Sequence, residues 1–118
     1  SCTMQNVLIG DGCIISDAHL KRCVIGERSV IRSGTEMENV YMIGADHFED
    51  EFISVPLGIG EHCHIKNCII DRNARIGAGA TLSPEGKPAN YDHSEDIYIR
   101  DHVLCIGKHA VIPSGFSF

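Results

Sequence analysis

Aliphatic residues recur along this chain with a period of six, which fits neither a helix face nor a simple alternating strand. A second beat accompanies the first, because the dipeptide Ile-Gly returns at intervals that are, in four cases of five, 16 to 18 residues. The six-residue period is clearest at Ile25, Ile31, Met37 and Ile43. The dipeptide occurs at Ile9-Gly10, Ile25-Gly26, Ile43-Gly44, Ile59-Gly60, Ile76-Gly77 and Ile106-Gly107.

Such a chain turns a corner every six residues, closes a triangular coil of about 18 residues and stacks its coils into a parallel β-helix. The aliphatic residue that opens each hexad points into the prism, where full burial is worth roughly 1.5–3 kcal/mol. The residue four places later also points inward and must be small. These residues are Cys13, Ser29, Cys63, Ala74, Ala80 and Ala110.

We therefore predict an all-β fold, a left-handed parallel β-helix built as a hexapeptide-repeat solenoid. The hand is the one usual for coils this short and does not follow from the residues. The alternative, a sandwich of short strands, requires period-two alternation and hairpin turns, and neither dominates here.

Two segments break the rhythm and are expected to leave the helix and return to it. They are ADHFEDEFISVP, between Gly44 and Leu57, and PEGKPANYDHSE, between Ser83 and Asp96. Without them the chain suffices for about five coils, so residues 1–118 are predicted to form a single β-helix domain with two loop insertions.

The two ends of the chain differ. The repeat is under way within a few residues of Ser1, without the polar cap that a solenoid normally carries. We therefore expect the chain to be the C-terminal fragment of a longer protein. At the other end, Ile112-Pro113-Ser114-Gly115 closes a last hexad, and Phe116 and Phe118 are expected to plug the prism.

The amino-acid composition limits the binding partners and the cellular compartment that can be expected for this chain. The formal net charge of −6 argues against nonspecific nucleic-acid binding. No apolar run approaches the roughly 20 residues of a membrane span. The six cysteines contain no CxxC pair, and buried free thiols are favoured over a disulfide framework, which indicates a reducing compartment.

Motifs that carry chemistry are scarce. The GxxxxGK[ST], GxGxxG, GxSxG and HExxH patterns are absent. His62 and His64 form an HxH pair on a predicted strand, where zinc could use them with a third ligand, but two surface imidazoles are the favoured interpretation. The acids of HFEDE, residues 47–51, are interpreted as a solvated charge run and not as a metal site. No metal, catalytic residue or cofactor is predicted.

Arg72 and Lys108 are the basic residues of most interest. Each occupies the third place of its hexad, an outward corner place, and one loop insertion separates the two hexads. Cations on adjacent corners would make a seat for phosphate or carboxylate. From the residues alone, two solvated surface cations are the favoured alternative.

Several motifs resemble a known family. The segment SVPLGIGEHCHIKNCIIDRNARIGAGATL, residues 54–82, is similar to the C-terminal β-helix of ADP-glucose pyrophosphorylase, also called glucose-1-phosphate adenylyltransferase. YMIGADHFE, residues 41–49, and the closing Ile112-Pro113-Ser114-Gly115 resemble the same family. The similarity covers nearly the whole chain in order, and it is closest to the plant and cyanobacterial branch.

The resemblance implies a regulatory and oligomerisation domain. That family joins ATP and glucose 1-phosphate into ADP-glucose and pyrophosphate for starch or glycogen synthesis, with catalysis in an N-terminal nucleotide-binding domain that has no counterpart here. The domain alone is thus expected to be inactive. Its expected partners are its own catalytic domain, the other subunits of a homo- or heterotetramer, and the effectors 3-phosphoglycerate and phosphate. The expected compartment is the plastid stroma or the bacterial cytoplasm.

The resemblance also assigns roles to the two cations. Family lysines implicated in activator binding match Arg72, in IIDRNARIG, and Lys108, a few residues before the final IPSG. Arg72 departs from the family lysine, keeping the charge but changing the donor geometry. Two alternatives stay open: a hexapeptide-repeat acyltransferase or γ-class carbonic anhydrase, and a purely structural docking module.

Overall fold

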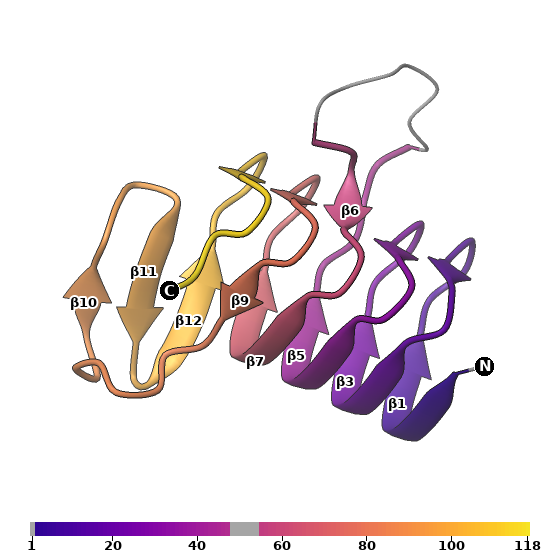
Figure 1. The fold of residues 1–118 in the computed structure, drawn as a ribbon, viewed down its shortest axis with the longest axis horizontal. Helices are drawn as coiled ribbons and strands as arrows, with labels where there is room; N and C mark the ends of the chain where they lie inside the picture. Colours follow the sequence, from indigo (N-terminus) through magenta and orange to yellow (C-terminus); the bar gives the residue numbers. More distant parts are fainter. Residues whose placement is uncertain (1, 48–54) are drawn as a thin grey trace.

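The chain forms a parallel β-helix of five coils (Figure 1). The computed structural model describes residues 2–47 and 55–118. The described residues contain strands, turns and bends but no helix, and therefore no helix long and apolar enough to cross a membrane. The acids Glu49, Asp50 and Glu51 of the predicted charge run lie outside the described residues.

Two sheets form the walls of the prism. The eight-stranded sheet has the order β1-β3-β5-β7-β12-β11-β10, with β9 beside β7, and the five-stranded sheet has the order β13-β8-β6-β4-β2. The first comprises β1 (Thr3–Ile9), β3 (His19–Ile25), β5 (Glu36–Met42), β7 (His64–Ile70), β9 (Thr81–Leu82), β10 (Tyr91–Asp92), β11 (Ile97–Arg100) and β12 (Val103–Ile106). The second comprises β2 (Ile14–Ile15), β4 (Val30–Ile31), β6 (Gly58–Ile59), β8 (Arg75–Ile76) and β13 (Val111–Ile112).

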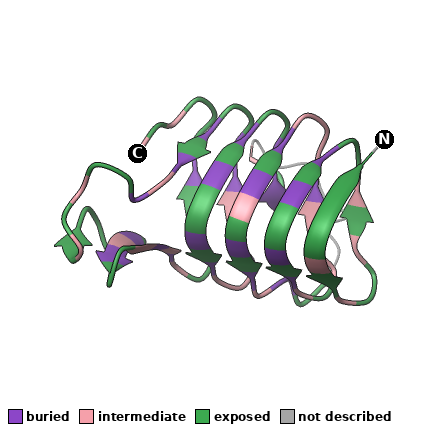
Figure 2. Ribbon diagram, turned by 90° about the horizontal axis from the view of Figure 1, so that it is seen from below, coloured by how far each residue is buried: buried purple, intermediate pink, exposed green. Residues whose placement is uncertain are grey.

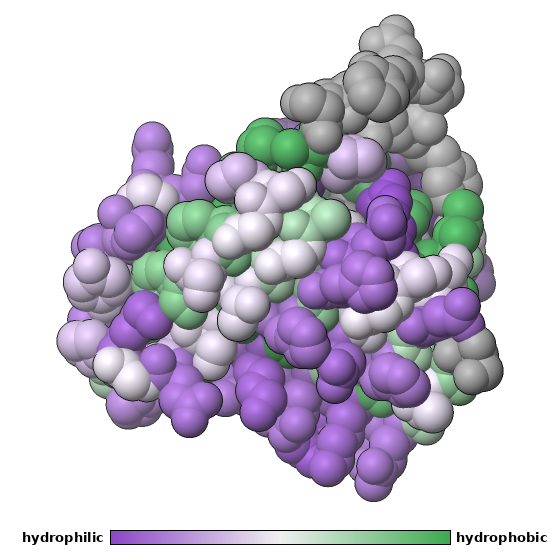
Figure 3. All heavy atoms as spheres, viewed as in Figure 1, coloured by the Kyte–Doolittle hydropathy of each residue, from purple (hydrophilic) through white to green (hydrophobic). Residues whose placement is uncertain are grey.

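The long strands each bend around one corner of the prism. In β3 and β7 two successive residues are exposed in the middle of an otherwise alternating pattern, and in β5 the matching two are one intermediate and one exposed residue (Figure 2). One of the two adopts a positive φ: Arg22 at 52°, Asn39 at 55° and Asn67 at 49°. Hydrophilic residues gather over these bends, along the lower edge of the molecule in Figure 3.

The stacked interior follows the predicted columns except in the third coil. The predicted inward position of Ile43 was wrong, because the coil that starts at Ile25 closes after 17 residues and brings Met42 level with Ile25 and Ile70, which leaves Ile43 half-buried. Ile25, Ile59 and Ile76 are at most 1% exposed, because each is covered by the coils on both sides and by the other walls. Ile106 is also 1% exposed, with Ile70 on one side of it and Ile97 of β11 on the other. Ile9 is 43% exposed, since the first coil has a neighbour on one side only. The predicted small column is buried as well, except that Cys13 is only partly so. Its buried members are Ser29, Cys63, Ala74, Ala80 and Ala110.

Close backbone contact explains the glycine of the Ile-Gly beat. A Cβ on Gly26 would lie 2.0 Å from the carbonyl oxygen of Ile43, and a Cβ on Gly77 would lie 2.4 Å from the nitrogen of Ser114. Neither contact is sterically possible, and the obstructing atoms belong to the backbone of the next coil. The glycine therefore lets consecutive coils stack at the spacing of a parallel sheet.

The second insertion differs from the predicted loop. It contains the strand β10, which pairs with β11 just after the insertion, and β11 pairs antiparallel with β12, with Ile99 opposite Leu104. Ile97 and Ile99 are buried, so the returning segment extends the large sheet and adds to the core. The physical reason is that β12 would otherwise expose an unpaired edge, and β11 covers it.

The C-terminus closes the prism as predicted. Phe116 and Phe118 are partly buried and pack against the core. The Phe116 carbonyl accepts a hydrogen bond from Thr81 N, and Phe118 N donates one to the Thr81 carbonyl. The rings also contact the second insertion, where His93 meets both phenylalanines edge-on and Lys87 lies 4.4 Å from the Phe118 ring centroid.

Replacing a column residue should destabilise the whole stack. Ile76→Ala is expected to lower the free energy of unfolding by about 2–5 kcal/mol, because Ile76 is fully buried and the rigid walls would leave a cavity. Val111→Ala is the control, since Val111 is 57% exposed and should change stability by about 0.5 kcal/mol or less. Urea denaturation followed by circular dichroism measures both. Equal losses in the two variants would contradict the column model.

Thiol reactivity provides a second test of the interior. All six cysteines are free, as predicted; Cys2 is exposed, whereas Cys63 and Cys68 are buried. Burial raises the pKa of the Cys63 and Cys68 thiols, so little thiolate forms at pH 8. We expect Ellman's reagent to modify Cys2 rapidly in the folded chain and Cys63 and Cys68 only in urea. Cys2→Ser should abolish the rapid phase; rapid reaction of Cys68 would show that the prism opens.

Candidate functional site

Arg72 and Lys108 occupy equivalent places on neighbouring coils. Arg72 lies in the turn between β7 and β8, and Lys108 lies in the turn between β12 and β13. The register is set by the pairing of Ile70 with Ile106, two residues before each cation. His109 N donates a hydrogen bond of 2.9 Å to the Arg72 carbonyl, which holds the two turns together. The predicted adjacency of the two cations is therefore confirmed.

The turns bend here because the residue after each cation adopts a left-handed conformation. Asn73 has φ 59° and His109 has φ 61°, at the fourth place of their hexads. Asn and His are among the non-glycine residues that adopt this region most often, and the stacked neighbours offset the remaining cost, which is about 1–2 kcal/mol for an L-residue. The bend directs the preceding side chain outward, which leaves Lys108 exposed and the Arg72 side chain 40% exposed.

The coil before Arg72 contributes a third charged residue, Asp46, to this corner. Asp46 follows β5 at the start of the first insertion. Its Oδ1 lies 2.7 Å from Nη1 of Arg72, and its Oδ2 accepts a hydrogen bond of 3.0 Å from the Asn73 side-chain amide. Asp46 N also donates to Oδ1 of Asn73 at 3.0 Å. Both carboxylate oxygens are thus engaged by the following coil.

This corner stabilises negative charge. The pKa of Asp46 is held below its usual range, first by the hydrogen bond from Asn73, then by the hydrogen bond and charge of Arg72, with the charge of Lys108 acting in the same direction. Desolvation acts in the opposite direction but does not outweigh the two hydrogen bonds, and the Asp46 side chain is 51% exposed. An anion at the position of this carboxylate therefore interacts favourably with both cations.

A shallow groove of about 470 Å³ borders the same corner and extends over the first coils. Arg28 and Arg72 both line it, and its floor includes Ile9, Val24 and Ile43. Arg28 is already engaged, because its Nε donates to the Ala45 carbonyl at 2.9 Å and its Nη1 lies 3.2 Å from Oε2 of Glu27. The groove gives solvent and small ligands access to Arg72.

The HxH pair is arranged differently from the prediction. His64 begins β7, but His62 lies in the turn before the strand, with φ 56°, so placing both on one strand was wrong. The ring of His62 lies over Gly34, where a Cβ would be 2.1 Å from Nδ1, whereas His64 approaches Glu36 at 3.6 Å. In the described parts of the chain, no three His, Cys, Asp or Glu side chains form a group that could hold a metal ion.

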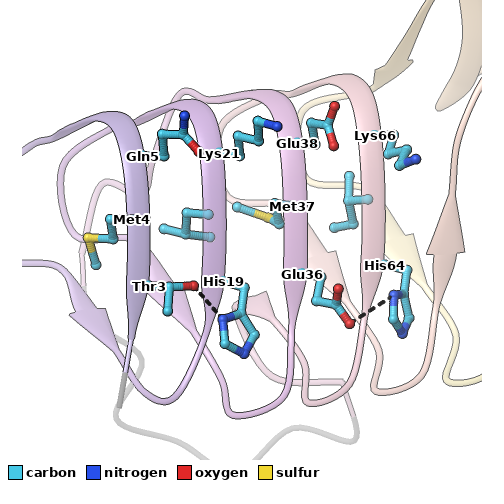
Figure 4. A pocket seen from close by; sticks show the side chains of 12 residues that line it. Thr3, Met4, Gln5, His19, Lys21, Glu36, Met37, Glu38, His64 and Lys66 are labelled. Atoms are coloured by element: carbon cyan, nitrogen blue, oxygen red, sulfur yellow. Dashed lines mark hydrogen bonds and ion pairs between the residues drawn. The ribbon is translucent and has the colours of Figure 1, made fainter.

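A second groove, also of about 470 Å³, crosses the outer face of β1, β3, β5 and β7. Figure 4 shows two rows of polar side chains along it, with one residue from each strand in each row. In one row Glu38 lies between Lys21 and Lys66, and in the other Glu36 lies between His19 and His64. Each row therefore sets an acid among basic residues, and the groove is less suited to a phosphate than the corner is. One row contains Thr3, His19, Glu36 and His64, and the other contains Gln5, Lys21, Glu38 and Lys66.

Sequence reasoning missed Asp46 and Asn73. Asp46 stands three residues after Ile43, as Asn73 does after Ile70, and this count places both near one corner. In the structure Met42, not Ile43, is level with Ile70, so the count places Asp46 only to within one residue. The signal was obscured because Asp46 adjoins the acidic HFEDE segment and was counted with the insertion. The repeat pattern does not predict that the Asp46 side chain points toward Arg72.

Comparison with known proteins identifies the fold family. The model of the GLGC left-handed parallel β-helix domain matches residues 1–116. A curated relative, the large subunit 1 of glucose-1-phosphate adenylyltransferase, chloroplastic/amyloplastic, from Zea mays, is 37% identical over 123 residues. That match covers 97% of this chain and 24% of the relative, so the chain spans about a quarter of the relative's length. The chain belongs to the GLGC left-handed parallel β-helix domain family.

Proposed function

We propose that this chain is the regulatory and subunit-association domain of a glucose-1-phosphate adenylyltransferase, and that its Arg72–Lys108 corner binds anionic effectors. The family and the maize relative support the assignment to that enzyme. In this proposal the adenylyl transfer takes place in a separate catalytic domain. The proposed effectors are inorganic phosphate and 3-phosphoglycerate.

The observation that carries the effector proposal is the carboxylate of Asp46. It is bound by a guanidinium and an amide and lies within the field of Lys108. These are the groups that phosphate and carboxylate ligands use in proteins, with arginine supplying directed donors and lysine a mobile point charge. Lys108 is exposed and makes no ion pair within residues 2–47 and 55–118, so it is available to a ligand.

The stacked geometry also supports a role in subunit association. The maize relative is named as a large subunit, and thus belongs to an assembly. On this chain the outer face of the large sheet carries an exposed apolar column of Leu8, Val24, Tyr41 and Ile69, all level in register. We propose that association uses such faces and leaves the cationic corner open to solvent. The plastid stroma is the proposed compartment if the source is a plant or alga, and the cytoplasm if it is a bacterium.

Charge reversal at Lys108 tests the effector site. In Lys108→Glu, phosphate affinity is expected to fall on the order of tenfold or more, because a cation near the bound anion becomes a repelling carboxylate. An NMR titration with inorganic phosphate measures this through the amide of His109, which is bonded to the Arg72 carbonyl. Lys66→Glu, on the outer face of β7, is the matched control and should bind as the wild type does. Equal affinity in all three chains would refute the proposed site.

The corner's preference for negative charge can be measured without any ligand. Asn73→Gly removes the amide that donates to Asp46 while tolerating the positive φ, so the pKa of Asp46 should rise toward its ordinary value. A carbon-detected NMR titration of the Asp46 carboxyl follows the change. Asn39→Gly, at another corner with φ 55°, is the control and should leave that pKa in place.

The sign of the linked stability change follows from the lowered pKa. Stability contributed by ionised Asp46 is present above the ordinary pKa of aspartate and is lost as the pH falls through the lowered folded value. Asn73→Gly should therefore shift this acid loss of stability to higher pH. An unchanged Asp46 pKa would show that the hydrogen bond does not stabilise the charge.

A further inference from the structure

The ion pair between Asp46 and Arg72 occupies the position that an effector would need. Oδ1 of Asp46 is 2.7 Å from Nη1 of Arg72, and Oδ2 accepts the Asn73 amide. A phosphate or carboxylate ligand would use the same donors in the same way. The Asp46 carboxylate and a ligand anion cannot both accept full hydrogen bonds from these donors at the same time.

We propose that Asp46 is an internal competitor for the anion site: its carboxylate holds Arg72 when no effector is bound and must release it when an anion binds. This inference rests on the proposed function of the corner. In this arrangement the affinity for phosphate is set by the difference between two states, Arg72 paired with Asp46 and Arg72 paired with the ligand. The ion pair between Asp46 and Arg72 thus disfavours anions that bind weakly, and no rearrangement of the β-helix is needed.

The backbone around Asp46 is fixed, so rotation of the Asp46 side chain alone is enough to release Arg72. Ala45 is buried, its nitrogen donates to the Glu27 carbonyl, and its carbonyl accepts from Nε of Arg28, each at 2.9 Å. Asp46 N is likewise fixed by Oδ1 of Asn73. The main chain is thus anchored up to Asp46, whereas the carboxylate itself is half exposed and can rotate into solvent.

Displacement does not remove the charge. An Asp46 carboxylate that has rotated away is still attached to the same anchored backbone, within reach of the ligand, and it repels a bound anion. Asp46 therefore weakens binding in two ways, by occupying Arg72 and by opposing the incoming charge. Lys108 lies on the coil beyond Arg72 and is not hydrogen-bonded to Asp46, so it can attract the anion before Arg72 is released.

Asp46→Asn tests the inference, since it removes the charge with little change in shape. NMR titration of the 118-residue chain with inorganic phosphate should show binding about three- to tenfold tighter than in the wild type, as exposed ion pairs are individually weak. Asp92→Asn is the matched control. Asp92 forms an ion pair of the same length, 2.7 Å, with Arg100, and it should leave phosphate affinity unchanged.

The outcomes separate this inference from the function on which it rests. If the wild type binds phosphate and Lys108→Glu weakens binding, but Asp46→Asn binds no tighter, the competitor role is wrong and the effector site stands. If Asp46→Asn reveals binding that the wild type lacks, the competitor role is supported. If neither chain binds phosphate, both proposals fail. Asp46→Ala serves as a second variant, and the His109 amide shift verifies that the corner is folded.

Discussion

The structure depends on each coil lying level with the coils on either side of it. Ile59 reaches full burial only when the hexads are in register, because Ile31 and Ile76 lie level with it on the two neighbouring coils. In the larger sheet Ile25 depends in the same way on Met42, and Ile106 on Ile70. The backbone imposes the same condition through the glycine that follows, where a Cβ on Gly26 would collide with the next coil. Apolar burial thus favours stacking, and backbone contact fixes how closely the coils approach.

The register of the coils also determines which surface residues lie next to one another. In a parallel stack, residues at the same hexad place are one strand spacing apart, about 4.8 Å. Two cations at the third place of consecutive coils are therefore neighbours in space. Arg72 and Lys108 lie together for this reason, although 36 positions separate them in the chain. The repulsion between them is offset by Asp46, which the previous coil supplies at the same corner.

The period of the sequence was sufficient to predict most of what depends on register, namely the five coils, the inward columns apart from Ile43, whose place Met42 takes, and the adjacency of Arg72 and Lys108. It could not predict contacts that lie outside the repeat. The returning strand β11 pairs antiparallel with β12, a choice made by the unpaired edge and not by the hexad pattern, although Ile97 and Ile99 alternate as strand residues do. The orientation of Asp46 depends on a side-chain rotation that the period does not encode.

The first insertion acquires a role from its point of departure. It leaves the helix after Ala45, whose backbone is held by the previous coil, and so Asp46 is placed at the corner by the stack. A solenoid can lengthen a loop at a corner without disturbing its columns, since loop closure adds little free energy as length grows. Asp46, at the junction of the repeat and the insertion, is therefore positioned by the repeat, but its side chain does not have to fit into the apolar interior. That combination suits a residue that must bind Arg72 in one state and release it in another.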